Sequence, residues 1–169
     1  VHDSYHENTP VFTQNTKTKR VEYREGIFYG YKGYEKNGTP VRYPFGYGLS
    51  YSKFDYSDLC VEKLGPDSLT VSFVVANTGK CDASEISQVY VSDLSCSVPR
   101  PVKELKGFCK NFIKKGGRTR VEITLGKDAF SFYDVKSKSF VVEPGVFEIL
   151  VGTSSADIRL RQNVQIGAE

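Results

Sequence analysis

The sequence contains no methionine and only two histidines, His2 and His6, both close to its start. With so few histidines, no Ser/His/Asp or Cys/His catalytic set is indicated. The two histidines are four residues apart, a spacing that can bind a metal on a helix. Their neighbours do not favour a helix, however, and a chain end is usually loosely held. We therefore predict no metal site and no cofactor.

The chain also lacks a long apolar run and an excess of one charge. No apolar stretch approaches the roughly 20 residues of a membrane-spanning helix. Lys and Arg together number 23 against 20 Asp and Glu, a net charge of +3, which indicates neither nucleic acid nor membrane as a partner. The densest basic run, at 114–120, is predicted to be the solvated turn of a hairpin. The start of the sequence is polar, without the pattern of a signal peptide, and we expect a fragment of a longer protein.

No pair of cysteines has the C-x-x-C spacing of a zinc or redox site, so we expect mostly free thiols. The cysteines are Cys60, Cys81, Cys96 and Cys109. A single glycosylation sequon, Asn37-Gly38-Thr39, is weak evidence for secretion. The sequence therefore leaves an extracellular and a cytoplasmic location both open.

Aromatic residues, glycine and proline gather in one short segment, at 43–51. There Phe45 and Tyr47 alternate with Gly46 and Gly48 after Pro44. Glycine reaches backbone angles closed to other residues, and proline fixes φ, so a long helix is excluded. An ordinary Gly/Pro turn would explain the glycines but not the aromatics, which gain from burial. We predict a tightly packed crossing between domains at 43–53, preceded by an extended arm at 1–42.

Alternating apolar residues begin after this crossing and continue almost to the C-terminus, as expected of strands with one buried face. The predicted strands are 54–61, 69–75, 89–91, 105–108, 121–125, a hairpin of 140–142 with 146–151, and 158–166. A helical turn is predicted within 127–133. About seven short strands at this spacing predict an all-β fold, an immunoglobulin-like or fibronectin type III-like β-sandwich.

Several blocks of sequence carry a family resemblance. They are 21–28 with Gly30-Tyr31, 43–51, Asn77-Thr78-Gly79, 88–93, 98–101, 103–108, 131–134 and 142–145. In this order they resemble the C-terminal region of glycoside hydrolase family 3 β-glucosidases. Residues 1–42 then resemble the end of the α/β sandwich domain of those enzymes, and 54–169 their fibronectin type III-like domain.

The resemblance implies a parent enzyme that hydrolyses terminal β-D-glucosides with retention of configuration. Such enzymes use two carboxyl groups about 5 Å apart. In the family the nucleophile lies in an N-terminal barrel and the acid/base residue in the second domain, and neither motif occurs here. We therefore expect this chain to be inactive alone and to stabilise and position the catalytic domains. Its expected partners are those domains, and the sequence leaves a homo-oligomer open. A β-glucoside substrate would be bound by the parent enzyme and not by this chain alone.

The residues predicted to pack between domains are all aromatic: Tyr23, Phe28, Tyr31, Tyr43, Phe45, Tyr47 and Tyr51. An alternative function is that of a carbohydrate-binding or adhesion module, in which such tyrosines would stack on sugars. Glu22 and Glu25 could line a pocket, but anchoring of the arm is the preferred interpretation. Asp93 and Asp134 are predicted to bind turn backbone.

Overall fold

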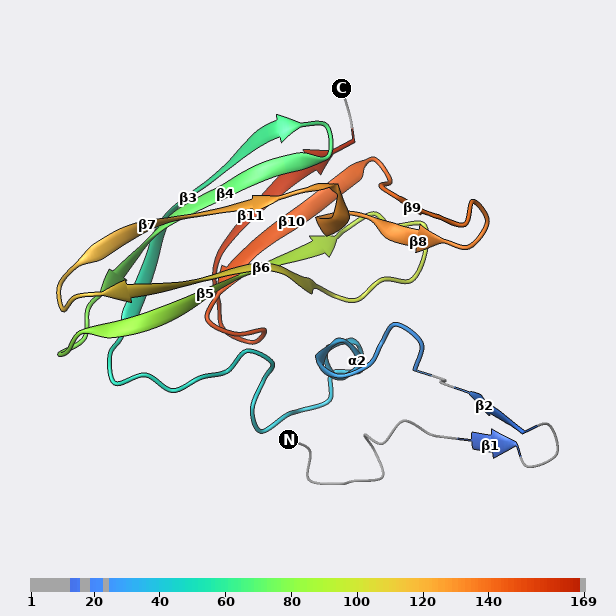
Figure 1. The fold of residues 1–169 in the computed structure, drawn as a ribbon, viewed down its shortest axis with the longest axis horizontal. Helices are drawn as coiled ribbons and strands as arrows, with labels where there is room; N and C mark the ends of the chain where they lie inside the picture. Colours follow the sequence, from blue (N-terminus) through green and yellow to red (C-terminus); the bar gives the residue numbers. More distant parts are fainter. Residues whose placement is uncertain (1–12, 16–18, 23–24, 168–169) are drawn as a thin grey trace.

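A four-stranded and a three-stranded antiparallel sheet pack face to face in this computed structural model (Figure 1). The first sheet has the order β11 (Ile158–Ile166), β10 (Gly145–Gly152), β5 (Ala83–Asp93), β6 (Glu104–Ile113). The second has the order β3 (Phe54–Gly65), β4 (Ser68–Asn77), β7 (Arg118–Leu125). The structure describes residues 13–15, 19–22 and 25–167. Side chains are described for residue 19 and for 25–167. The predicted all-β sandwich is confirmed.

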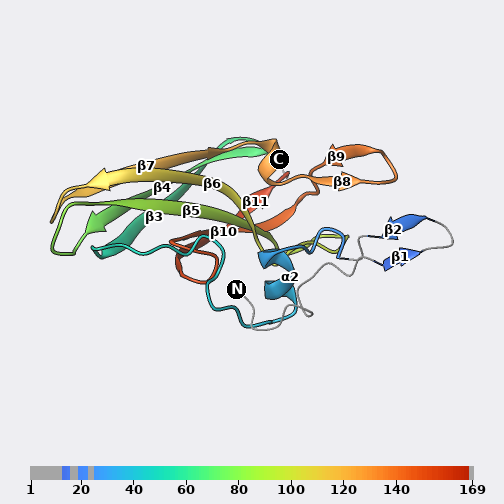
Figure 2. The same cartoon turned by 60° about the horizontal axis from the view of Figure 1, so that its bottom comes forward.

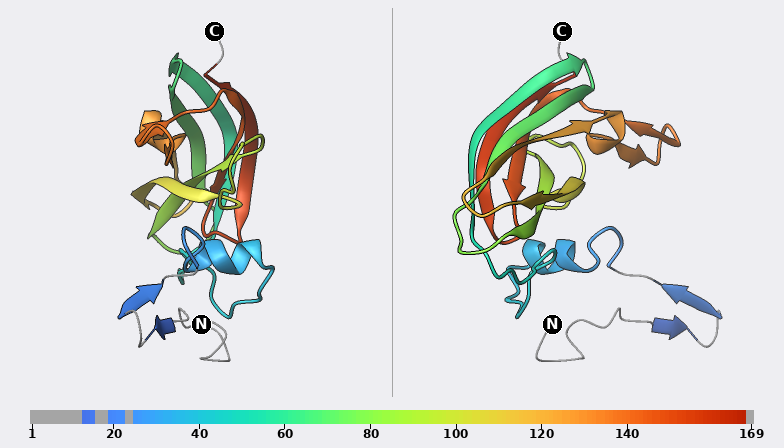
Figure 3. Two further views of the ribbon diagram at one scale, coloured as in Figure 1. Left: turned by 90° about the vertical axis from the view of Figure 1, so that its right-hand side faces the viewer. Right: turned by 60° about the vertical axis from the view of Figure 1, so that its left-hand side comes forward.

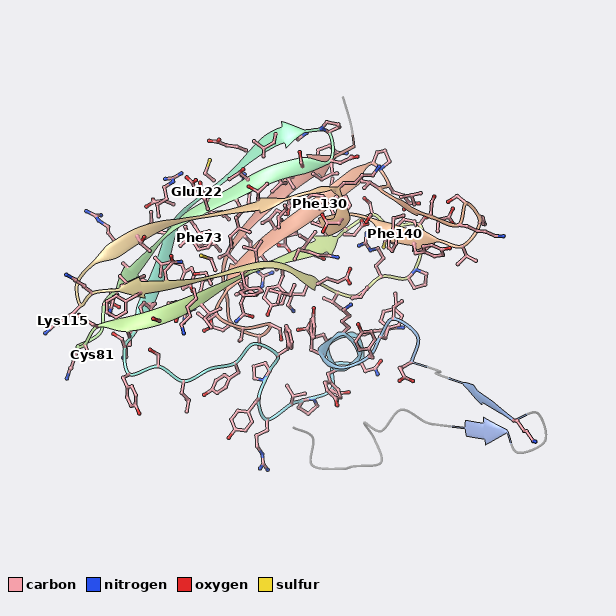
Figure 4. The ribbon with its side chains drawn as sticks, in the orientation of Figure 1. Phe73, Cys81, Lys115, Glu122, Phe130 and Phe140 are labelled. Atoms are coloured by element: carbon pink, nitrogen blue, oxygen red, sulfur yellow. The ribbon has the colours of Figure 1, made fainter. Side chains whose placement is uncertain are left out.

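The core lies between the two sheets and follows from the alternation of apolar residues. Leu69, Val71 and Phe73 of β4 are fully buried, and the polar side chains between them point away from the core. Phe130 and Phe147 meet edge to face there, with ring centroids 5.3 Å apart. Figure 4 shows Phe73 and Phe130 inside the sandwich and Glu122 of β7 on its outside. A β-strand places alternate side chains on opposite faces, so this pattern fixes which face of each strand is buried.

Two predicted strand connections are wrong. Residues 140–142 do not form a hairpin with 146–151, because β9 (Ser139–Val141) pairs with β8 (Phe132–Asp134), whereas β10 pairs with β5 and β11. The basic turn at 114–117 is not a hairpin within one sheet, because it carries the chain from β6 to β7 in the opposite sheet. Alternation indicates a strand but not its partner, and sequential strands are only usually neighbours. Within the predicted helical turn the chain forms a short 3₁₀ helix, η1 (Lys127–Ala129).

The segment before the sandwich has more local structure than the predicted extended arm. It contains a two-stranded ribbon, β1 (Thr13–Asn15) with β2 (Arg20–Glu22), and a short helix, α2 (Tyr31–Lys36). The prediction missed α2 because a helix of 6 residues with a central glycine leaves no periodic signal. Gly33 is required because a Cβ there would clash with the carbonyl oxygen of Phe28. Figure 2 shows α2 lying against the side of the sandwich.

None of the helices in the described part of the chain is long and apolar enough to span a membrane.

Candidate functional site

The most elaborate packing outside the core is the joint, our name for the contact of α2 and residues 43–53 with the β5–β6 side of the sandwich. Figure 3 shows α2 and the segment after it lying together against the sandwich. The ring of Phe45 stacks on Tyr31, with centroids 4.3 Å apart and planes 13° apart. Tyr31 in turn meets Tyr90 of β5 edge to face at 6.5 Å. The Ser155 N–H donates a hydrogen bond of 2.8 Å to the Phe45 carbonyl.

The side chain of Gln88, on β5, is buried and binds the crossing to the sandwich through three hydrogen bonds. Its side-chain amide donates to the carbonyl oxygens of Gly46, at 3.0 Å, and of Thr153, at 2.6 Å. Its side-chain oxygen accepts a bond of 2.6 Å from the Tyr90 hydroxyl. Gly46 has φ +79°, and a Cβ there would collide with the Gln88 side chain. Glycine is therefore required by both conformation and space.

Ion pairs fasten α2 to the strand β6 and the loop before it. Lys32 Nζ lies 2.9 Å from Glu104 Oε1, and Lys103 Nζ lies 2.9 Å from Glu35 Oε2. The Leu105 N–H donates a bond of 3.0 Å to the Tyr31 hydroxyl oxygen. Burial raises the pKa of Tyr31. Since each pair is mostly shielded from water, the pairs are expected to orient α2 more strongly than exposed pairs would.

Arg100 lies beneath this contact as a buried cation. Its side chain is 7% exposed and contacts Asp93 Oδ2 at 3.1 Å and Glu104 Oε2 at 3.3 Å. It also donates to the carbonyl oxygens of Phe130 and Ser131. Burial alone raises the pKa of Glu104, but the hydrogen bond from Lys32 and the nearby cations outweigh it and leave the pKa below its usual value. The site therefore holds Glu104 in its ionised form.

Two hollows border the joint. The larger, of about 1180 Å³, lies between the turn before α2, the Pro99-Arg100-Pro101 loop and the β8–β9 hairpin. Exposed aromatic side chains form its walls, among them Tyr29, Tyr133 and Phe140. The smaller, of about 500 Å³, is lined by Glu35, Tyr43 and Phe45, among others. Figure 4 shows Phe140 on the hairpin, away from the core.

The structure brings together some of the residues predicted to pack between domains and leaves others facing water. The ring centroids of Tyr43 and Tyr47 lie 5.4 Å apart, and the two residues are 55% and 49% exposed. Tyr51 is 99% exposed, whereas Phe28 is partly covered and has Lys36 Nζ 3.4 Å from its ring centroid. Tyr23 lies outside the described residues, as do His2 and His6. The backbone of the crossing is thus hydrogen-bonded to the sandwich, while several of its aromatic side chains are exposed to solvent.

The carboxylates singled out in the sequence have structural surroundings where they are described. The Asp93 side chain accepts from the Ser95 N–H at 3.1 Å, and Asp134 accepts from the Lys136 and Ser137 N–H groups at 3.0 Å each. These bonds confirm both aspartates as turn residues. The Glu25 carbonyl accepts from the Phe28 N–H, and the side chain of Glu22 lies outside the described part.

Sequence reasoning missed Glu85. Burial raises the pKa of Glu85, and the Tyr56 hydroxyl donates a bond of 2.9 Å to it. It does not line either of the two hollows. All four cysteines are free thiols, and within the described ranges no three His, Cys, Asp or Glu side chains are grouped as metal ligands.

Comparison with known proteins gives a consistent result. Residues 85–155 match the fibronectin type III-like domain. The chain is 47% identical over 152 residues to thermostable β-glucosidase B of Acetivibrio thermocellus, covering 88% of this chain and 20% of the relative. It is 46% identical over 138 residues to exo-α-(1→6)-L-arabinopyranosidase of Bifidobacterium longum, covering 82% and 18%.

A solved structure agrees with this result. The GH3 β-glucosidase of Bifidobacterium adolescentis superposes with a TM-score of 0.90 at 36% identity, covering 96% of this chain and 24% of that one. The chain spans about a fifth of the length of the two relatives named above.

Proposed function

The chain is a relative of the glycoside hydrolase family 3 β-glucosidases that carries a fibronectin type III-like domain, and we propose that it is the non-catalytic C-terminal part of such an enzyme. In this proposal residues 1–42 end the preceding α/β domain, 43–53 are the interdomain crossing, and 54–169 are the fibronectin type III-like domain. The parent would hydrolyse terminal β-D-glucosides with retention, using two carboxyl groups upstream of this chain.

The observation that carries the proposal is the contrast between backbone and side chains in the crossing. Its backbone is bound to the sandwich through Gly46 and Phe45, whose carbonyls accept from Gln88 and Ser155. Its large side chains nevertheless remain exposed, with Leu49 at 90% and Tyr51 at 99%. An aromatic ring gains most when it is buried. Exposed aromatic rings on a backbone that is hydrogen-bonded to the sandwich are therefore best explained as half of a contact.

The proposed role is positional. In the parent, the sandwich and the crossing would fix the catalytic domains relative to each other and so hold the two carboxyl groups at working distance. A displacement of about 1 Å at such a site can cost on the order of 100-fold in rate. The named relatives support a role other than sugar selection, because a β-glucosidase and an arabinopyranosidase match this chain at 47% and 46% identity.

The experiment compares Tyr47→Ala in the longer protein with the same change in the 169-residue chain. Tyr47 is 49% exposed here, so the change should leave the Tm of the isolated chain nearly unaltered. In the longer protein the ring would be buried between domains, and we expect Tm and kcat to fall together. Unchanged Tm and kcat in the longer protein would refute the interdomain contact.

A further inference from the structure

The outer face of β5 and β6, in the four-stranded sheet, differs from the outer face of β7. On β7 the outward residues are polar or charged, for example Arg120 and Glu122. On β5 and β6 the outward residues include Ile86, Phe108 and Phe112, which are 45%, 69% and 64% exposed. Outward positions of a sandwich are normally polar, so an uncovered group of large apolar side chains indicates an interaction surface.

The strand register places these three side chains on one face. Phe108 lies opposite Gln88, Lys110 opposite Ile86, and Phe112 opposite Ser84. Directly opposite residues of an antiparallel pair share a face, and Gln88 points outward because it binds the Gly46 carbonyl. Cys109 and Ile113, each next to one of these phenylalanines in the sequence, lie on the core side of β6. We call Ile86, Phe108 and Phe112 the β5–β6 patch.

The patch is continuous with the joint. Gln88 contacts the crossing at Gly46 and is also the register partner of Phe108. Figures 1 and 2 both show the segment leading into β3 running along the side of the sandwich where β5 lies. Whatever covers the exposed rings of the crossing is therefore expected to reach the neighbouring patch.

We propose that the β5–β6 patch is a second contact surface for the preceding domains of the same longer protein, extending the interdomain contact beyond the crossing. This inference rests on the proposed function. We infer that the preceding domains cover the patch because the crossing lies beside it. The crossing is the segment by which the chain would leave those domains. The named relatives have about four fifths of their length outside the matched region. The exposed charge on the patch is Lys110, so the covering surface has an apolar centre with a carboxylate opposite this lysine.

Lysine acetylation tests the proposal by comparing two exposed lysines, one on β6 and one in the turn that follows it. Lys110 lies within the patch, whereas Lys115 lies at the tip of the β6–β7 turn, labelled in Figure 4. Acetic anhydride is applied to the isolated 169-residue chain and to the longer protein, and modified peptides are quantified by mass spectrometry. We expect Lys110 to react in the chain and lose its labelling in the longer protein, with Lys115 labelled in both. Labelling of Lys110 in both proteins would overturn the proposal.

A second copy of the chain is the competing occupant. If it covers the patch, Lys110 becomes protected in the isolated chain as concentration rises, and sedimentation shows a dimer. That outcome would also overturn the proposal.

A double variant, Phe108→Ser with Phe112→Ser, gives a second readout. It should leave the Tm of the isolated chain unchanged and lower the Tm of the longer protein. The matched control is Leu64→Ser, 62% exposed on β3 of the other sheet, which should alter neither. If Tyr47→Ala lowers Tm in the longer protein and the double variant does not, the crossing contact stands and the patch proposal is overturned. If Tyr47→Ala also has no effect, the proposed function itself fails.

Discussion

Replacing Gln88 by alanine should release the crossing from the sandwich and destabilise the chain. Gln88 is 5% exposed and makes three hydrogen bonds, two to backbone carbonyls and one from the Tyr90 hydroxyl. The change leaves two partly buried carbonyls and the buried Tyr90 hydroxyl without this partner. A net loss of about 1 kcal/mol for each bond gives about 3 kcal/mol, before any cavity is counted.

This loss is measurable in the isolated chain. For a protein of this size 1 kcal/mol lowers Tm by about 2–4 °C, so Gln88→Ala should lower Tm by about 6–12 °C. Calorimetry gives the Tm, and limited proteolysis at 43–53 reports release of the crossing. The matched control is Gln165→Ala on the exposed side of β11, which should stay within about 0.5 kcal/mol of the parent chain. Equal effects of the two changes would refute the network.

Three further predictions concern the same joint. Gly46→Ala should destabilise the chain by at least about 1 kcal/mol, because φ at Gly46 is +79° and the new Cβ would meet the Gln88 side chain. Gly48→Ala is the control, because a Cβ there has open space and should be tolerated. Thermal melts of the two variants test this difference. Arg100→Met should cost about 3–5 kcal/mol in urea unfolding, because it leaves Asp93 buried without its cation, and a loss below about 1 kcal/mol would contradict this. The pKa of Glu104 is lowered in the folded state, so its stabilisation is present above the usual value of 4.5 and is lost as pH falls through the folded pKa; Glu104→Gln should remove this part of the acid dependence, and identical pH profiles of Tm would refute it.

The sandwich could be predicted from sequence because burial of one face imposes a visible period of two. Leu69, Val71 and Phe73 carry that signal, and the strand at Ile158–Ile166 was located correctly for the same reason. Strand pairing is harder to predict, since β9 precedes β10 in the sequence but pairs with β8. The order of apolar residues along a chain contains little information about which sheet a strand joins.

The joint was only partly predictable. The cluster of aromatics with Gly46 and Pro44 indicated a packed crossing, because that combination is unusual for a plain turn. The residues that bind it lie far away in the sequence and have no local pattern: Gln88 is 42 positions from Gly46, and Glu104 is 72 positions from Lys32. Long-range hydrogen bonds and ion pairs depend on the assembled sheets, so they become visible only when the strands are placed.

The most direct test of the account is hydrolysis of an aryl β-glucoside by the purified 169-residue chain, measured with the longer protein in parallel. The account predicts a cooperative thermal melt and no turnover for the chain, with turnover in the longer protein. Turnover by the chain that survives stringent purification would contradict the account, and Glu22 and Glu25 would be the first residues to replace.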